Sequence, residues 1–370
     1  MKIIKKILSG TFIPNKYRSL YRKKYSKSLV INRIKALEFE PLTKEEKKHI
    51  ISFWKQYVKN INFSSFIFYK KFCKLTSQLP YYLPEDIYYP IIDMYFTNPY
   101  LASIYDNKNI YDLYFHDVSQ PKTIVRYMNG MFLDHHYKVI SREDALAKCK
   151  SNEQIILKPA SCSEGGRGIL FIENTNQNFE VQLATFFAKN KDAIVQEIVK
   201  QHEILNTIHK DSLNTIRIIT LLINNEVHPL SSILRMGRNG KRVDNASSGG
   251  VFCGINTDGS LKKMTYDCKG NTYEGHPNGT KTEGLVIPHF SQATEMVKHL
   301  APRIMHISSL CSWDLALDKN GQYKLIEVNM SFGQLDFHQI CNGPLFGNKT
   351  EEILKHVFAI SLDRKLVNYE

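Results

Sequence analysis

Residues 313–329 read WDLALDKNGQYKLIEVN, which is two short strand-like runs separated by Asn320-Gly321. An Asn-Gly dipeptide between alternating apolar residues is the strongest short-range signal of a β-hairpin, because both residues tolerate a positive φ. With this dipeptide as a two-residue loop, Lys319 pairs with Gln322, and the register of the whole hairpin follows. The sequence therefore predicts a pair of antiparallel strands at this position.

Counting outward along the predicted hairpin places Asp314 opposite Glu327. Because side chains alternate between the two faces of a strand, these carboxylates and Asn329 project from the same side. Two carboxylates directly opposite each other repel and destabilise a sheet. Mg²⁺ removes the conflict, since it is bound by such oxygens together with phosphate oxygens and water. The hairpin thus predicts a metal site at Asp314, Glu327 and Asn329, with a solvated acidic hairpin as the alternative.

The composition is that of an ordinary globular protein, with 43% hydrophobic and 23% charged residues in 370. This length allows two domains, or one large domain with subdomains. The seven cysteines are an odd number and include no Cys-x-x-Cys pair, so we expect reduced thiols in a cytoplasmic protein. Apolar runs are too short for a membrane-spanning helix.

Positive charge is concentrated at the start of the chain. The formal net charge is +13, and the first 27 residues contain many lysines and arginines but no acidic residue. Such a segment is typical of proteins that contact an anionic membrane or a polyanion, or of a solubilising terminal segment. Nucleic-acid binding is not expected, because no recognised nucleic-acid-binding motif accompanies the charge.

The first 118 residues predict a mainly helical N-terminal region. Apolar residues recur at helical spacing between residues 45 and 58, and four prolines between residues 80 and 99 then break the chain into short pieces. Two further helices are predicted downstream. One opens at Ser141, a favoured N-cap residue. The other has one face marked by Phe179, Leu183, Phe186 and Phe187.

A glycine-rich loop lies between two strand-like runs in residues 154–173, QIILKPASCSEGGRGILFIE. Glycines and small residues let the backbone approach a ligand and present successive N–H groups to phosphate. Lys158, at the end of the first run, would add a positive charge for the same phosphates. The loop is not a Walker A motif, because no Gly-Lys-Ser/Thr follows and a strand comes next. A tight structural turn is the alternative interpretation.

Two later strands carry polar groups. Residues 193–199, AIVQEIV, contain Gln196 and Glu197 at the strand end, where a carboxylate and nearby backbone groups could bind an adenine edge; a glutamate on a strand rim is the alternative. Residues 214–222 form a buried-strand pattern that contains Arg217. A buried arginine requires a partner, which would be either an anionic ligand or a carboxylate.

Small and polar residues dominate the segments that follow. Arg235 ends another strand-like run near a ligand-facing position, and residues 244–250, DNASSGG, form a loop where backbone could meet substrate. Residues 273–289 are rich in glycine, proline and histidine, and a loop of that length generally binds something or is disordered. His276 and His289 within it are either acid–base groups or ordinary surface histidines.

In this order, Lys158, the glycine-rich loop, Gln196-Glu197 and the 313–329 hairpin resemble the ATP-grasp superfamily. More narrowly, residues 105–345 are similar to the sugar-transfer associated ATP-grasp family, which is found with surface-polysaccharide genes. The motifs behind the narrower resemblance are NTIR at 214–217, LRMG at 234–237, VDN at 243–245, GG at 249–250, HP at 276–277, WD at 313–314 and IEVN at 326–329. Part of this set also resembles ribosomal-protein glutamate ligases, another ATP-grasp branch.

The resemblance implies an α+β fold, with ATP held between two subdomains; the mainly helical N-terminal region is predicted from its residue pattern. Together these predict four parts: a basic helical region at 1–118, a small subdomain with the glycine-rich hairpin at 119–200, a large subdomain with the metal site at 201–346, and a C-terminal helix at 347–370.

The resemblance also implies roles for individual residues. Lysines and the loop of residues 161–168 would hold the phosphates, the Glu197 region would hold adenine, and Glu203 or His202 would lie near the ribose. The implied cofactor-binding residues are Lys108, Lys158, Ser163, Gly165, Gly166, Gly168, Gln196, Glu197, Val199 and Glu203. One or two Mg²⁺ ions would be held by Asp314, Glu327 and Asn329.

The implied catalytic residues are Arg217, Arg235 and Asn245. Many members carry an arginine two residues before the first metal carboxylate, where this chain has Ser312, so Arg217 or Arg235 would take its place. The usual family chemistry joins a carboxylate to an amine through an acyl phosphate, with ATP and Mg²⁺.

The expected function is therefore a ligase in surface-polysaccharide or capsule biosynthesis, for example one that amidates a uronic acid with an amino acid. A kinase that phosphorylates a sugar hydroxyl is the first alternative. A non-catalytic protein that binds a membrane or glycan through its basic N-terminus is the second.

Overall fold

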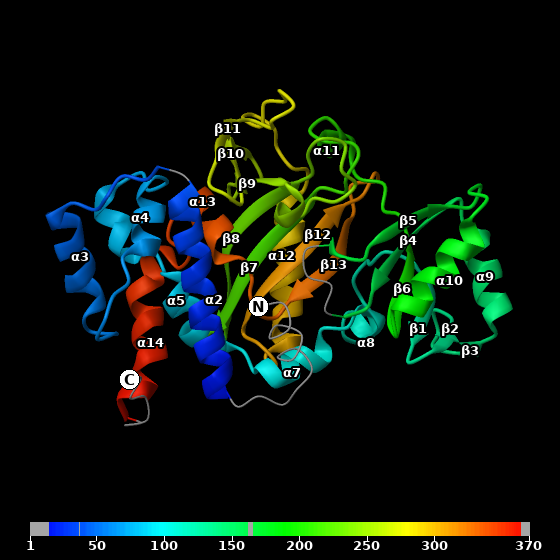
Figure 1. Cartoon of the computed structure of the whole chain (residues 1–370), viewed down its shortest axis with the longest axis horizontal. Coiled ribbons are helices and arrows are strands. Elements are labelled where there is room, and N and C mark those ends of the chain that lie inside the picture. The colour runs from blue at the N-terminus through cyan, green and yellow to red at the C-terminus, as the bar shows by residue number, and fades with distance from the viewer. Residues whose placement is uncertain (1–14, 37, 162–165, 364–370) are drawn as a thin grey trace. The chain divides into compact units, whose positions relative to one another are not determined.

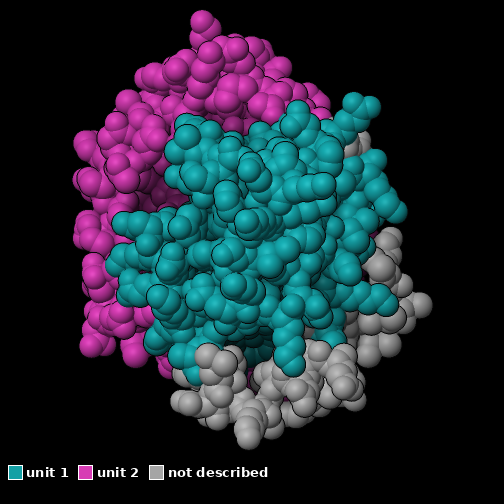
Figure 2. All heavy atoms as spheres, turned by 90° about the vertical axis from the view of Figure 1, so that its left-hand side faces the viewer, with its two compact units in different colours: residues 1–99, 331–370 teal, residues 100–330 magenta. Residues whose placement is uncertain are grey.

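The computed structural model describes residues 15–36, 38–161 and 166–363 (Figure 1). The chain divides into two compact units, which Figure 2 colours separately: unit 1 comprises residues 1–99 and 331–370, and unit 2 comprises residues 100–330. This division groups residues 331–346 with the N-terminal region. The four-part division by function given above stays a prediction. Among the described helices, none combines the length and apolar character needed to cross a membrane.

Unit 1 is helical in its described part, as predicted for the N-terminal region. Its helix α3 begins at a capping box, in which Thr43 Oγ1 accepts from Glu46 N and Glu46 Oε2 accepts from Thr43 N. The helical elements are α2 (Asn15–Ala36), α3 (Lys44–Trp54), α4 (Ser64–Lys70), η1 (Thr76–Tyr81), α5 (Glu85–Ile87), η2 (Tyr88–Ile92), α6 (Asp93–Phe96), α13 (Leu335–Asn342), η7 (Gly347–Lys349) and α14 (Thr350–Asp363).

Ion pairs with buried carboxylates fix helix α2 within unit 1. Arg22 Nη1 donates to Asp93 Oδ2 at 2.7 Å, and Arg33 pairs with Asp336 of α13. Removing one partner of a buried ion pair leaves an uncompensated charge, which typically costs about 3–5 kcal/mol. Helix α2 is therefore an integral part of unit 1 and carries exposed lysines on its outer side, among them Lys23, Lys24 and Lys27.

Unit 2 contains a six-stranded antiparallel sheet, ordered β3-β2-β1-β6-β4-β5. Its strands are β1 (Thr123–Met128), β2 (Met131–Leu133), β3 (Val139–Ile140), β4 (Gln154–Pro159), β5 (Leu170–Glu173) and β6 (Asp192–Glu197). Helices α9 (Arg142–Lys150) and α10 (Phe179–Lys189) supply apolar side chains to its core. Ser141 caps α9 and the four predicted apolar residues of α10 are buried, so both helix predictions are confirmed.

The larger sheet of unit 2 has seven antiparallel strands, ordered β11-β10-β9-β8-β7-β12-β13. Its strands are β7 (Thr215–Ile223), β8 (Glu226–Met236), β9 (Val251–Ile255), β10 (Leu261–Asp267), β11 (Thr272–Glu274), β12 (Leu310–Leu317) and β13 (Tyr323–Asn329). Helix α12 (Phe290–Leu300) packs its apolar residues against one face, with η6 (Ala301–Ile304) following it. The other short elements are α7 (Pro99–Tyr105), η3 (Lys108–Ile110), α8 (Tyr111–Tyr114), α11 (Glu203–Asn206) and η5 (Ala246–Ser248).

Strands β12 and β13 form the hairpin predicted at residues 313–329. Its loop has three residues instead of two, because Asp318 N donates to Gln322 O at 2.9 Å and Gly321 N donates to Asp318 O. Only Gly321 of the Asn-Gly pair has a positive φ, of 79°. The predicted pairing of Lys319 with Gln322 is therefore wrong.

A β-bulge at Ile326 restores the register further along the hairpin. Leu315 pairs with Leu325, but Asp314 pairs with Glu327, so β13 contains one extra residue between them. The extra residue also changes the alternation of faces. Leu325 and Val328 both enter the apolar core, and Glu327 is left on the opposite face with Asp314. The predicted pairing of Asp314 with Glu327 is confirmed.

Candidate functional site

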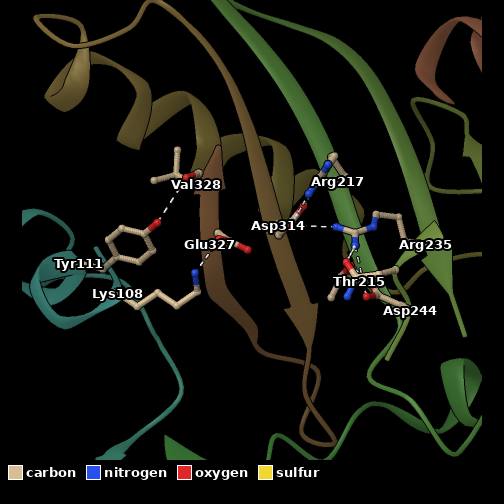
Figure 3. A network of polar contacts seen from close by, with 10 residues as sticks. Lys108, Tyr111, Thr215, Arg217, Arg235, Asp244, Asp314, Glu327 and Val328 are labelled. Carbon is tan, nitrogen blue, oxygen red and sulfur yellow. Dashed lines mark hydrogen bonds and ion pairs between the residues drawn. The ribbon is translucent and has the colours of Figure 1, made fainter. Parts of the chain in front are cut away.

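Asp314 lies between two arginines on the sheet face opposite α12 (Figure 3). Arg217 on β7 donates from Nε to Oδ1 and from Nη2 to Oδ2, both at 2.6 Å, and Arg235 on β8 donates to Oδ2 at 2.9 Å. All three side chains are buried. Burial alone would raise the pKa of Asp314, but the two guanidinium groups hold that pKa below its ordinary value. The partner required by the buried Arg217 is thus a carboxylate.

Glu327 is paired with a cation from another part of the chain. Lys108 Nζ, on η3, lies 2.7 Å from Glu327 Oε1. Burial alone would lower the pKa of Lys108, but Glu327 and Asp106 raise it above its ordinary value. The two carboxylates that face each other across the hairpin are therefore each neutralised by side chains from β7, β8 or η3, and the sheet does not bear their full repulsion.

The predicted metal ligands fit Mg²⁺ in their chemistry. The second carboxylate oxygen of Glu327 accepts no hydrogen bond from the described residues, and the buried Nδ2 of Asn329 has no partner among them. Turning the Asn329 amide by half a turn would place its oxygen at that position instead. Asp314 Oδ2 accepts from both arginines and Oδ1 accepts from Arg217, so a metal ion would compete with the arginines for this carboxylate.

Two carboxylates and one amide, each giving one oxygen, leave about half of an octahedral shell to other oxygens. No group of three or more His, Cys, Asp or Glu side chains in the described ranges is placed to hold a metal ion. A cation at this position would therefore depend on phosphate oxygens and water for its remaining ligands.

Lys158 on β4 is buried, and it is not paired with a carboxylate among the described residues. Its Nζ donates to Gln196 Oε1 on the adjacent strand β6, at 3.1 Å. Burial, and then the nearby charge of Lys108, lower the pKa of Lys158 to about 8. A buried ammonium group with one neutral partner is costly, so this position favours an anionic ligand.

The glycine-rich loop reaches the arginine network through Asn245. Residues 162–165, which include the predicted Ser163 and Gly165, lie outside the described residues. Gly166 has a φ of +69°, and a Cβ on it would stand 2.2 Å from Asn245 Nδ2. Asn245 Oδ1 in turn accepts from Arg235 Nη2 at 2.6 Å. Gly168 also has a positive φ, of 79°, so the end of the loop depends on glycine.

The structure thus brings together seven of the predicted residues. Lys108 also binds the start of the loop, because its N–H donates to Ala160 O at 2.8 Å. The residues that are linked to one another by these contacts are Lys108, Gly166, Arg217, Arg235, Asn245, Asp314 and Glu327.

Other predicted residues have separate contacts. Gln196 binds Lys158 and also donates to Pro121 O at 3.4 Å. Glu197 accepts from Lys122 N at 3.1 Å, and Glu203 is exposed at the start of α11. Val199 lies in the segment between β6 and α11. Their roles in adenine and ribose binding stay predictions.

One member of the network was not predicted. Asp244 lies 3.3 Å from Arg235 Nη2 and accepts a short hydrogen bond from Thr215 Oγ1. Its carboxylate balances the second guanidinium charge, which Asp314 alone does not. The signal in the sequence was the carboxylate directly before Asn245 in the VDN motif.

A family model described as sugar-transfer associated ATP-grasp matches residues 94–355. The chain belongs to this family. It has the ATP-grasp fold, an α+β architecture, and the match includes every residue of the network described above. ATP-grasp homologues bind ATP with Mg²⁺. A search of curated proteins found no match.

Solved structures similar to this ATP-grasp chain are distant. D-alanyl-alanine synthetase A from Vibrio cholerae has 15% identity and a TM-score of 0.41, covering 71% of this chain and 66% of that chain. VanG D-Ala:D-Ser ligase from Enterococcus faecalis has 14% identity and a TM-score of 0.42, covering 70% and 63%. Biotin carboxylase from Campylobacter jejuni has 13% identity and a TM-score of 0.44, covering 69% and 47%. The chain spans less than two thirds of each of these structures.

The lowered pKa of Lys158 predicts a pH dependence of nucleotide binding. The lysine is charged below its pKa of about 8 and loses its charge above it, so affinity for a non-hydrolysable ATP analogue should fall as the pH rises through 8. Lys158→Arg keeps its charge and should show little change between pH 7 and 9, whereas Lys158→Met should bind about tenfold more weakly at pH 7. Calorimetry at fixed free Mg²⁺ measures this. If affinity for the ATP analogue falls equally with rising pH in the wild type and in Lys158→Met, Lys158 is not the cause of the pH dependence.

Gly166→Ala should impair nucleotide binding more than an alanine at another left-handed glycine. The new Cβ would meet Asn245 Nδ2 at 2.2 Å, and the φ of +69° is unfavourable for alanine. Gly130→Ala is the matched control, because Gly130 has a φ of +86° and nothing within 4 Å. Both variants are compared by thermal melting and by affinity for the ATP analogue. Indistinguishable affinities would show that the contact with Asn245 is unimportant.

Proposed function

We propose that this protein is an ATP- and Mg²⁺-dependent ligase that joins a carboxylate to an amine. The observation that carries the proposal is the convergence of Asp314, Glu327 and Asn329 with Lys108, Arg217 and Arg235 on one sheet face, in a chain of the ATP-grasp family. Such a site supplies charge neutralisation to phosphoryl groups, and this is what phosphoryl transfer to a carboxylate requires.

The proposed reaction has two steps. The γ-phosphoryl group passes from ATP to a carboxylate oxygen, which forms an acyl phosphate and releases ADP. The amine nitrogen then attacks the carbonyl carbon, inorganic phosphate leaves, and the amine loses a proton. A Mg²⁺ ion held by Glu327 and Asn329, with Asp314, would neutralise the phosphate oxygens.

The chain's own residues would have separate tasks in these steps. Lys158 would neutralise phosphate oxygens from β4 of the smaller sheet, since it is buried with a neutral partner, and Lys108 would do so from η3. Arg217 and Arg235, placed by adjacent strands, would stabilise charge on the acyl phosphate, and Asn245 would orient one of them. Glu197, Val199 and Glu203 would hold the adenosine part.

The substrates follow from the family name and not from the site geometry. We propose a sugar or polysaccharide precursor, such as a uronic acid that is amidated by an amino acid, in cell-surface polysaccharide or capsule biosynthesis. The proposed location is the cytoplasm, where ATP is available.

Glu327→Gln should lower turnover about 100-fold or more, because it removes a charge that balances Lys108 and, in the proposal, a metal ligand. Glu327 is partly exposed, so the variant should fold, whereas Asp314→Asn would leave two buried arginines less well compensated. Glu226→Gln, at an exposed end of β8, is the control. The assay screens acids and amines for ADP release, with mass spectrometry of the product.

Near-normal ADP release by Glu327→Gln would refute the assigned role of this carboxylate. ADP release with a phosphorylated sugar and no amide would show that the protein is a kinase instead.

We further propose peripheral contact with an anionic membrane through the basic N-terminal segment. The exposed Lys23, Lys24 and Lys27 on α2 continue the positive charge of the first residues of the chain. Each lysine near an anionic surface contributes about 1 kcal/mol to binding.

Replacing Lys23, Lys24 and Lys27 by glutamine should therefore reduce binding to vesicles that contain phosphatidylserine, measured by sedimentation. This test retains Arg22 and its ion pair with Asp93, which a deletion of residues 1–27 would remove. Replacement of three exposed lysines in unit 2, Lys122, Lys189 and Lys200, is the control. An equal loss of vesicle binding in both triple variants would indicate a general charge effect. Unchanged vesicle binding in both variants would show that the lysines of α2 have no role in membrane contact.

A further inference from the structure

Three cations lie beside the network without a carboxylate partner in the described part of the chain: Arg238, Lys241 and Arg242. Their contacts are with neutral groups. Arg238 Nη1 donates to the hydroxyl of Tyr273 at 3.1 Å, and Lys241 Nζ donates a short hydrogen bond to Ser248 O. The buried Nε of Arg238 has no hydrogen-bond partner among the described residues.

A tight turn holds two of these cations close together. Asn239 and Gly240 have φ values of +58° and +69°, and Lys241 N donates to Arg238 O at 3.3 Å. These features define a β-turn with both central residues in the left-handed region. The Arg238 guanidinium and the Lys241 ammonium each lie 3.7 Å from the point where a Cβ would stand on Gly249. Two like charges so placed repel each other, and an anion between them would relieve the repulsion.

The third cation connects this loop to the glycine-rich hairpin. The guanidinium carbon of Arg242 lies 4.1 Å from the ring centre of Phe171, on β5. Asn245, in the same loop, reaches both Gly166 and Arg235. The three cations therefore border the proposed reaction centre. In the described part of the chain, the side-chain partners of Lys108, Lys158 and Glu327 are other residues.

We propose that Arg238, Lys241 and Arg242 form a second anion site, which binds a phosphoryl or diphosphoryl group of the acceptor substrate. An arginine fork and an ammonium group are the side chains that bind phosphate oxygens most strongly. The assignment of this anion to the acceptor substrate rests on the proposed ligase function. The binding of an anion in addition to the nucleotide is independent of that function.

The test measures binding of inorganic pyrophosphate to the protein already saturated with Mg²⁺ and a non-hydrolysable ATP analogue. Calorimetry at low ionic strength and constant free Mg²⁺ should detect pyrophosphate binding by the wild type. Arg238→Gln with Lys241→Gln should weaken it about tenfold or more, because two charge-assisted hydrogen bonds are lost. Affinity for the ATP analogue should be unchanged.

The matched control is Arg142→Gln with Lys150→Gln, which removes one arginine and one lysine from the exposed side of α9. Its pyrophosphate affinity should stay within about twofold of the wild type, since exposed charges at a distance are screened. A charge-conserving variant, Arg238→Lys with Lys241→Arg, should also keep most of the affinity. If it binds as weakly as the glutamine variant, the loss comes from the loop structure and not from charge.

The proposal is overturned if nucleotide-loaded wild type does not bind pyrophosphate, or if the glutamine variant binds it as well as the wild type. It is also overturned if the glutamine variant loses affinity for the ATP analogue to the same extent, because the cations would then belong to the nucleotide. These binding measurements do not depend on catalysis, so they test the anion site even if the ligase assay detects no product. In that assay, the wild type should prefer a phosphorylated sugar acid over its unphosphorylated form. Loss of this preference in the glutamine variant would assign the anion to the acceptor.

Discussion

The buried charge network around Asp314 is the constraint on which the site in unit 2 depends. Two arginines on adjacent strands and one carboxylate on a third are buried together, and each would be costly to bury alone. The ion pairs with Asp314, together with the pair between Arg235 and Asp244, fix Arg217 and Arg235 in orientation on the sheet face. The same arrangement leaves Asn245 and Glu327 at the edges of the network, where one contacts the glycine-rich loop and the other contacts Lys108.

The bulge at Ile326 makes this network compatible with a packed core. Without the extra residue, the register set at the turn would place Ile326 opposite Asp314 and turn Glu327 toward α12. With it, Val328 fills the core while Glu327 faces the cations. The result is one sheet with an apolar face and a charged face, which is how a single hairpin serves both stability and the proposed chemistry.

Much of this could be predicted from local sequence. The hairpin, the α10 face and the pairing of Asp314 with Glu327 follow from short-range patterns, and the order of motifs indicated the family. The loop length and the bulge could not be predicted, because Asn-Gly suits both two- and three-residue loops and a bulge depends on packing. Lys108, Arg217 and Arg235 were predicted as site residues, but the carboxylate that each of them neutralises could not be predicted. Lys108 lies 219 residues from Glu327 and Arg217 lies 97 from Asp314, and only the fold brings them together.

In the proposed mechanism, Glu327, Asn329 and Asp314 hold a divalent ion that accompanies the nucleotide. Anomalous scattering from Mn²⁺, in crystals grown with a non-hydrolysable ATP analogue, tests it most directly. We expect a Mn²⁺ peak at direct coordination distance from an oxygen of Glu327 and of Asn329, with Asp314 released by one arginine and phosphate oxygens completing the shell. A nucleotide bound with its metal away from these side chains, while both arginines still occupy Asp314, would contradict it.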